Sequence, residues 1–171
     1  MGNLMVAKTI TGEAILTGVV TKIEEQGFRI KNCLYDNGKA REVEVYIMYS
    51  GCDKDVIKPG AKIYVLADIS GKVIKGLKAT EKPFKWKIGN HTIVIRSRFK
   101  LIKCEERYSR IKAELDGKTE FVSFWNDTGN PTGKRIEQVF GSGREIDTAV
   151  VCNASESNGK TFYNGHYFMC N

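Results

Sequence analysis

The chain has few of the residues from which metal centres and histidine-based catalytic sites are built. Only two histidines are present, His91 and His166, and each lies far in sequence from any cluster of cysteines or carboxylates. The five cysteines are widely spaced, without a CxxC or CxxxC pair. They therefore give no zinc-binding pattern. The sequence predicts no metal site, no cofactor and no catalytic triad, and its thiols are expected to be reduced and buried.

Two further catalytic patterns are incomplete. The segment GNPTGKR at residues 129–135 resembles a phosphate-binding loop, but it has three residues between its glycines where four are needed. Arg135 also occupies the position of the Mg²⁺-binding hydroxyl. Scattered acids such as Glu105 and Asp116 show no spacing that indicates a two-metal nuclease. We therefore expect a protein that is not an enzyme, with an enzyme or accessory domain acting on a nucleic acid left open as an alternative.

Long apolar runs and export signals are missing as well. No stretch approaches the ~20 apolar residues of a membrane-spanning helix. The first residues contain no basic segment followed by an apolar core and a cleavage site. Val6 stands where N-myristoylation requires Ser or Thr. These features predict a cytoplasmic protein that does not bind membranes.

Positive charge, in contrast, is abundant. The chain has 27 Lys and Arg residues against 20 Asp and Glu, a formal net charge of +7. Such a balance favours a polyanionic partner, and nucleic acid is the commonest one.

Alternating apolar and polar residues predict that the chain is mostly β-strand. In the first half the expected strands are residues 14–24, 28–35, 41–49, 61–70 and 72–80, with a short helical turn at 53–57. In the second half they are residues 92–104, 145–154, 161–170 and the two arms of a hairpin within 107–127. One short amphipathic helix is expected at Lys134 to Phe140, where Ile136, Val139 and Phe140 have helical spacing.

This order of elements matches a five-stranded OB barrel, and it occurs twice. Gly18 interrupts the first strand, where a bulge or sharp bend is expected. Pro83 and the following FKWKIGN form the expected crossover between the halves. The fold class is therefore all-β, with two tandem five-stranded OB-fold barrels, one over residues 1–84 and one over residues 85–171.

An internal repeat supports the two barrels. The RIK sequence at residues 29–31 aligns with the RIK sequence at residues 110–112. With a gap of two residues, the Gly-Lys pair at 38–39 also aligns with the pair at 117–118. Each repeat then contains about 80 residues, enough for a small barrel, and its cations occupy the same place.

The hairpin within residues 107–127 is the segment with the clearest binding character. Asp116 and Gly117 are typical of a tight two-residue turn. One face of its first strand is apolar, with Ile111, Ala113 and Leu115. The other face carries Tyr108, Arg110 and Lys112. The second strand contains Phe121, Phe124 and Trp125, of which at least one must fill the barrel and at least one should lie outside, beside the cations. Exposed rings beside cations suit single-stranded nucleic acid.

The segment GREIDTAVVCNASESNGKTFYNGHYFMC, residues 143–170, resembles the fourth strand, the following loop and the fifth strand of the single-stranded DNA-binding proteins of bacteria and their phages. The resemblance implies an OB fold that binds single-stranded DNA on its first three strands and two loops. It implicates Arg98, Tyr108, Arg110, Lys112, Trp125 and Lys160. The chain departs from that family in having two barrels and no acidic tail, which favours a replication or recombination protein of a phage or mobile element.

The residues expected to bind nucleic acid are mostly in the second half. They are Arg96, Arg98, Lys100, Tyr108, Arg110, Lys112, Trp125 and Lys160. In the first half the candidates are Arg29, Lys31 and Tyr46, but Glu42 and Glu44 place acids on the face that includes Tyr46. We therefore expect the second barrel to be the principal binding surface. The first is expected to be a weaker site, a dimerisation element or a dock for a partner.

The leading hypothesis is a non-catalytic single-stranded DNA-binding protein. RNA stays open as the ligand, because stacking and phosphate contacts serve both polymers. A homodimer and replication or recombination proteins stay open as partners. The alternative from another class is a tandem OB-fold module for protein–protein interaction. A binding face should show rings flanked by cations, whereas an interaction module should show an uncharged apolar patch.

Overall fold

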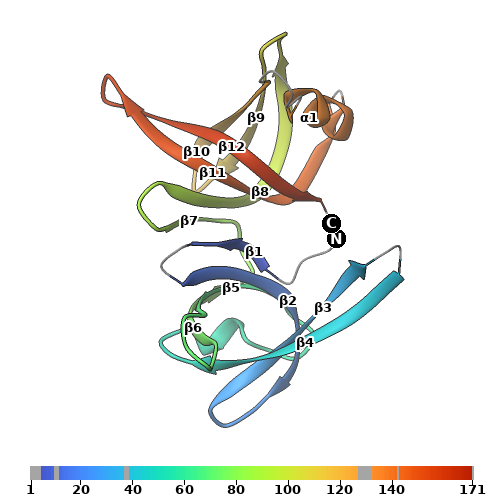
Figure 1. The fold of residues 1–171 in the computed structure, drawn as a ribbon, viewed down its shortest axis with the longest axis vertical. Coiled ribbons are helices and arrows are strands. Elements are labelled where there is room, and N and C mark those ends of the chain that lie inside the picture. Colours follow the sequence, from blue (N-terminus) through green and yellow to red (C-terminus); the bar gives the residue numbers. More distant parts are fainter. Residues whose placement is uncertain (1–4, 10–11, 37–38, 127–131, 142, 171) are drawn as a thin grey trace. The chain divides into compact units, whose positions relative to one another are not determined.

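The computed structural model describes residues 5–9, 12–36, 39–126, 132–141 and 143–170. The chain divides into two compact units, Met1–Lys82 and Pro83–Asn171, both built mainly of strands (Figure 1). Within the described residues, no helix has the length and apolar character needed to cross a bilayer.

The first unit is a closed barrel of five strands with one extra strand. Its elements are β1 (Met5–Lys8), β2 (Glu13–Ile23), β3 (Gly27–Asp36), β4 (Lys39–Tyr49), the short 3₁₀ helix η1 (Lys54–Val56), β5 (Lys62–Asp68) and β6 (Lys75–Thr80). The strands are hydrogen-bonded in the order β2-β3-β4-β6-β5, and β5 pairs back to β2 to close the ring. The β4–β6 pairing is parallel and the others are antiparallel. Strand β1 adds to β2 outside the ring.

The second unit repeats this design. Its elements are β7 (Phe84–Ile88), β8 (Thr92–Cys104), β9 (Tyr108–Leu115), β10 (Lys118–Trp125), the helix α1 (Thr132–Phe140), β11 (Glu145–Ser157) and β12 (Lys160–Cys170). The ring is β8-β9-β10-β12-β11, closed by the β11–β8 pairing. Here too the third and fifth ring strands, β10 and β12, pair in parallel. Strand β7 adds to β8 outside the ring, as β1 adds to β2.

Both units therefore have the strand order of the OB fold, with a helical element between the third and fourth ring strands. In the first unit this element is the single turn η1, and in the second it is α1, whose Ile136 and Phe140 are fully buried one turn apart. The predicted fold class is confirmed. The predicted helix is also confirmed and begins at Thr132.

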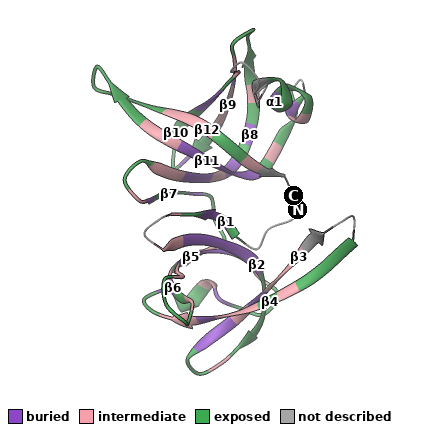
Figure 2. Cartoon of the chain, in the orientation of Figure 1, coloured by how far each residue is buried: buried purple, intermediate pink, exposed green. Residues whose placement is uncertain are grey.

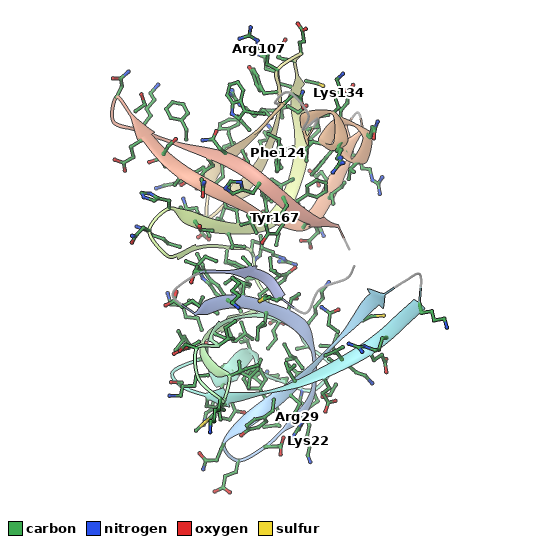
Figure 3. The ribbon with its side chains drawn as sticks, in the orientation of Figure 1. Lys22, Arg29, Arg107, Phe124, Lys134 and Tyr167 are labelled. Carbon is green, nitrogen blue, oxygen red and sulfur yellow. The ribbon has the colours of Figure 1, made fainter. Side chains whose placement is uncertain are left out.

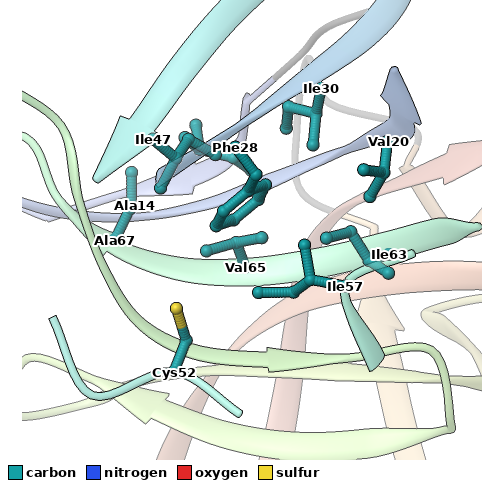
Figure 4. Packing of buried hydrophobic residues seen from close by; sticks show 11 residues of the cluster. Ala14, Val20, Phe28, Ile30, Ile47, Cys52, Ile57, Ile63, Val65 and Ala67 are labelled. Atoms are coloured by element: carbon teal, nitrogen blue, oxygen red, sulfur yellow. The ribbon is translucent and has the colours of Figure 1, made fainter. Parts of the chain in front are cut away.

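Alternation along the strands builds a separate core in each unit (Figure 2). Figure 4 shows the first core, in which Phe28, Ile47 and Val65 gather with Cys52 in the barrel interior. The second core contains Phe99, Phe124 and Phe140, all fully buried. A buried aromatic or branched aliphatic side chain contributes about 1.5–3 kcal/mol, so each barrel has its own stabilising interior.

The segment FKWKIGN is not the crossover that the sequence predicts. Phe84 to Ile88 form β7, which pairs with β8 from Phe84↔Arg96 to Ile88↔Thr92. The period-two pattern explains this, because Phe84 and Ile88 are buried while Lys85 and Lys87 between them are exposed. The predicted boundary follows residue 84, whereas Phe84 itself pairs within the second unit.

Gly18 does not bend β2 by a bulge. The register shift lies between Val20 and Lys22 instead. A Cβ atom on Gly18 would lie 2.8 Å from the carbonyl oxygen of Lys31 on the neighbouring strand. The glycine is therefore required for close approach of two backbones.

The expectation that the cysteines are buried holds for two of them. Cys52 and Cys152 are buried free thiols, Cys33 is half-buried and Cys104 is exposed. The side chain of Cys170 lies outside the described part of the structure. Cys104 is the last residue of β8, at the exposed end of that strand.

Candidate nucleic-acid interface

The β9–β10 hairpin sets the geometry of the candidate site. Asp116 and Gly117 have φ values of 51° and 77°, as a primed two-residue turn requires. This turn places Leu115 opposite Lys118 and fixes the register of the whole hairpin. Further along, Lys112 faces Phe121 and Tyr108 faces Trp125. The short turn therefore brings the predicted cations and rings onto neighbouring positions.

Strand alternation decides which rings point outward. Phe124 is fully buried with Val122 and fills the barrel (Figure 3), whereas Phe121 and Trp125 are each 47% exposed. On β9, Ile111 is fully buried while Arg110 is half-buried, on the outward parity. The prediction that at least one large ring lies outside beside the cations is confirmed.

Side-chain contacts hold the outer face in place. The rings of Tyr108 and Trp125 lie 4.9 Å apart between centroids, and the Arg110 guanidinium lies 5.3 Å from the centre of the Tyr108 ring. Arg110 Nε donates to Ser123 Oγ at 3.1 Å. The Trp125 indole N–H donates to Asn164 Oδ1 at 3.0 Å. The half-buried Tyr108 ring, the exposed Trp125 ring and the Arg110 guanidinium therefore lie in a defined arrangement.

A groove opens where β10 and β12 separate. These strands pair only at Val122↔Tyr163 and Ser123↔Asn164, and beyond that point each continues with its other neighbour, β9 or β11. The groove has a volume of about 530 Å³. Its lining side chains come from both hairpins and include Arg110, Glu120, Phe121, Ser123, Trp125, Lys160, Phe162, Tyr163 and Asn164.

Arg110 and Lys112 carry charge that no acid of the described residues neutralises. Among the ion pairs of the described residues, none involves either side chain. Lys112 lies opposite Lys100 of β8 on one side and opposite Phe121 of β10 on the other. Like-charged neighbours on adjacent strands repel each other. An anionic ligand bound to this face would reduce that repulsion.

Arg96 and Arg98 lie apart from the groove, in acidic surroundings. Together with Glu114, Glu145 and Asp147 they line a different hollow of about 480 Å³. The Arg96 guanidinium forms an ion pair with Asp147 at 2.9 Å. The structure therefore brings Arg110, Trp125 and Lys160 into the groove. Tyr108 contacts Trp125, Lys112 lies opposite the groove residue Phe121, and Lys100 lies opposite Lys112 on the next strand. Arg96 and Arg98 do not line the groove.

The candidate residues of the first unit have acidic partners. Arg29 Nε lies 2.7 Å from a carboxylate oxygen of Glu24 (Arg29 is labelled in Figure 3), and Lys31 Nζ lies 2.8 Å from Glu42. The hydrogen bond from Glu42 raises the pKa of Lys31. The Tyr46 ring lies under the Arg29 guanidinium, at 5.3 Å. These cations are engaged within the protein.

A polar cluster lies at the floor of the groove. Glu120 has the inward parity of Val122 and Phe124 and is 9% exposed. Lys85 of β7 donates to Glu120 Oε1 at 2.5 Å and to the Tyr163 hydroxyl at 3.4 Å. The Glu120 hydrogen bond is the main cause that raises the pKa of Lys85. Glu120 and Tyr163 line the groove, and Lys85, which does not line it, donates hydrogen bonds to both.

Sequence reasoning missed several groove residues. Phe162, which is 48% exposed, and Asn164 lie on β12, and Glu120 lies on β10. The alternation Lys160, Phe162, Asn164 after the turn at residues 158–159 would have indicated the first two, because the three side chains share one strand face. No local pattern indicates Glu120, whose partner is 35 residues away. Within the described part of the chain, no three metal-ligating side chains gather into a site.

Comparison with known proteins gives only distant structural matches. No family model matches the chain, and no curated protein does. The wild-type single-stranded DNA binding protein from Thermus aquaticus is 13% identical over 98% of this chain and 85% of that one, with a TM-score of 0.33. A murine DNA binding protein bound with double-stranded DNA is 10% identical over 91% of this chain and 97% of that one, with a TM-score of 0.31. Similarity at this level supports no statement about family or function.

Proposed function

We propose that this protein binds single-stranded nucleic acid, and single-stranded DNA in particular, through the groove and outer face of its second barrel. The observation that carries the proposal is the convergence of exposed rings and unneutralised cations on one surface. Phe121, Trp125 and Phe162 lie exposed there, with Arg110 and Lys160 in the same groove.

The chemistry of this surface fits a single strand. Unpaired bases stack on aromatic side chains, and each stacked base contributes about 1–3 kcal/mol. Lys and Arg side chains neutralise the phosphates that separate the bases. A duplex hides its bases from such rings, so binding should favour a strand whose bases are free.

The charge of the surface argues against the interaction module. Such a module would present an uncharged apolar patch, whereas Trp125 and Tyr108 lie beside the Arg110 guanidinium.

A non-catalytic, cytoplasmic role in the replication or recombination of a phage or mobile element is part of the proposal. Its support is the sequence resemblance of residues 143–170 and the absence of a catalytic pattern.

Fluorescence anisotropy with labelled oligonucleotides tests the proposal. Oligo-dT, its RNA counterpart and a duplex of equal length should be titrated with the full chain over a range of salt concentrations. We expect single strands to bind more tightly than the duplex. The plot of log affinity against log salt should fall with a slope of about −0.7 for each phosphate neutralised. Tight binding that does not depend on salt, or a preference for the duplex, would contradict the proposal.

A further inference from the structure

A carboxylate at the floor of the groove is out of place in a site for phosphates. The groove carries the cations Arg110 and Lys160, but Glu120 also lines it. An ionised carboxylate can only accept hydrogen bonds, and it repels a phosphate. The part of the ligand that reaches this floor must therefore carry hydrogen-bond donors.

One oxygen of Glu120 is available to such a ligand. Oε1 accepts from Lys85, which fastens β7 to the barrel. Among the described residues, no donor lies within hydrogen-bond distance of Oε2, and the Glu120 side chain is 11% exposed. Each carboxylate oxygen has two acceptor positions, so Oε1 can also accept a second hydrogen bond beside Lys85.

The surrounding rings set the orientation of a base at this point. Phe121 precedes Val122 on β10, and Phe162 precedes Tyr163 on β12, where the two strands meet. Both rings are exposed and line the same groove as Glu120. A base that stacks on one of them can direct its Watson–Crick edge to the floor, the edge that single-strand readers use.

We propose that Glu120 is a specificity-determining residue that selects guanine at one position of the bound strand. Among the four bases, guanine alone presents two adjacent donors, N1–H and the N2 amino group, which match the two oxygens of a carboxylate. Thymine and uracil present one imide N–H between two carbonyl oxygens, which a carboxylate repels. This inference rests on the proposed function, and it adds base selectivity to a surface that would otherwise bind any sequence.

The test uses the full chain and labelled oligonucleotides of about ten nucleotides, within the site size of OB folds. Three oligonucleotides differ only at the central base, which is thymine, guanine or hypoxanthine in a background of thymines. A single guanine avoids guanine-quadruplex formation, and hypoxanthine lacks the N2 amino group. The wild type should bind the guanine strand about tenfold more tightly than the thymine strand, as expected for a two-hydrogen-bond base contact. The hypoxanthine strand should lie between them.

Glu120→Gln should abolish the difference in affinity between the guanine and thymine strands, because an amide offers one acceptor and one donor. Glu114→Gln is the matched control, since it removes an acid outside the groove, and it should keep the preference. Retention of the preference by Glu120→Gln would overturn the inference. Equal affinity of the wild type for all three strands would also overturn the inference, while the proposed function would still hold. This comparison needs only the wild type, so it remains decisive if the variant does not fold. Failure of the wild type to bind any strand would overturn both.

Discussion

The two barrels share one strand order but differ in what surrounds an identical pair of cations. In the first, Arg29 and Lys31 on β3 form ion pairs with Glu24 and Glu42. In the second, Arg110 and Lys112 occupy the aligned positions on β9, and neither forms an ion pair with any described carboxylate. The same residues on the same fold can therefore form ion pairs within the protein or stay available to a ligand, depending on the acids around them.

The neighbouring strand makes this difference. Lys31 lies opposite Glu44, and Arg29 lies opposite Tyr46, on β4. Lys112 lies opposite Phe121, and Arg110 opposite Ser123, on β10. Glu42 of β4 neutralises Lys31, and Arg29 is neutralised by Glu24, just after β2, and at 3.9 Å by Glu44 of β4. A ring and a hydroxyl on β10 leave Lys112 and Arg110 without such a partner. The second barrel should therefore account for most of the binding.

The largest expected effect is the loss of a stacking ring. Trp125→Ala should weaken single-strand binding by about 1–3 kcal/mol, because the exposed indole would no longer stack a base. Tyr46→Ala is the matched change in the first barrel and should have little effect, since that ring lies under Arg29. Oligo-dT titrations of both variants measure this difference, and equal losses would remove the distinction between the barrels.

The barrels also differ in their buried thiols, and this predicts a pH effect on stability. Burial raises the pKa of the Cys152 thiol from 9.0 to about 12. Between pH 9 and about 12, the thiol therefore stays protonated in the folded protein but loses its proton in the unfolded chain. Its contribution to stability is complete below pH 9 and is lost as the pH rises toward 12. At pH 10 the second unit should be about 1 kcal/mol less stable than at pH 8.

Urea unfolding of wild type and Cys152→Ala at the two pH values tests this effect. The variant should lose most of the difference between pH 8 and pH 10. Cys52→Ala, which alters the buried thiol of the first unit, should leave the loss in the second unit unchanged. An unaltered pH dependence in Cys152→Ala would show that another group is responsible.

Removing one available cation should have a smaller effect on binding. Lys112→Gln should make the salt dependence of binding shallower by about 0.7 in log–log slope, the value for one phosphate contact on a single strand. Lys31→Gln should leave the slope unchanged, because its ammonium is paired with Glu42. Salt titrations of the two variants compare aligned positions directly, and a larger change for Lys31→Gln would reverse the assignment.

The smallest expected effect is a gain of binding in the first barrel. Glu42→Gln releases Lys31 and should increase single-strand affinity severalfold at low salt, with a steeper salt dependence. Glu25→Gln changes the net charge equally at an exposed acid that forms no ion pair among the described residues, and it controls for charge alone. If the two variants gain equally, long-range charge rather than release of Lys31 is the cause.

Local patterns predicted most of the fold and part of the site. The Asp116–Gly117 turn fixed the hairpin register, and from it the outward direction of Trp125 follows. The RIK repeat correctly aligned β3 with β9, the second ring strand in each unit. Both signals are local in sequence. Because side chains alternate between the two faces of a strand, each signal also predicts which side chains point to the same face.

Contacts between distant segments could not be predicted in this way. Strand β7 was interpreted as a linker because Pro83 precedes it, although its alternation is that of a strand. The approach of Lys85 to Glu120 depends on β7 adding to the barrel, and the pairing of Arg96 with Asp147 depends on closure of β8 onto β11. Such neighbours follow from topology, which residue spacing alone does not specify.

The central claim is that the strand lies on the second barrel and not on the first. Photo-crosslinking of the full chain to bromodeoxyuridine-substituted oligo-dT, followed by peptide mass spectrometry, locates the contacts directly. The account predicts adducts on the peptides that contain Tyr108, Phe121, Trp125 and Phe162, all competed by unlabelled oligo-dT. Adducts concentrated on the Tyr46 peptide, with none on the β9, β10 and β12 peptides, would contradict it.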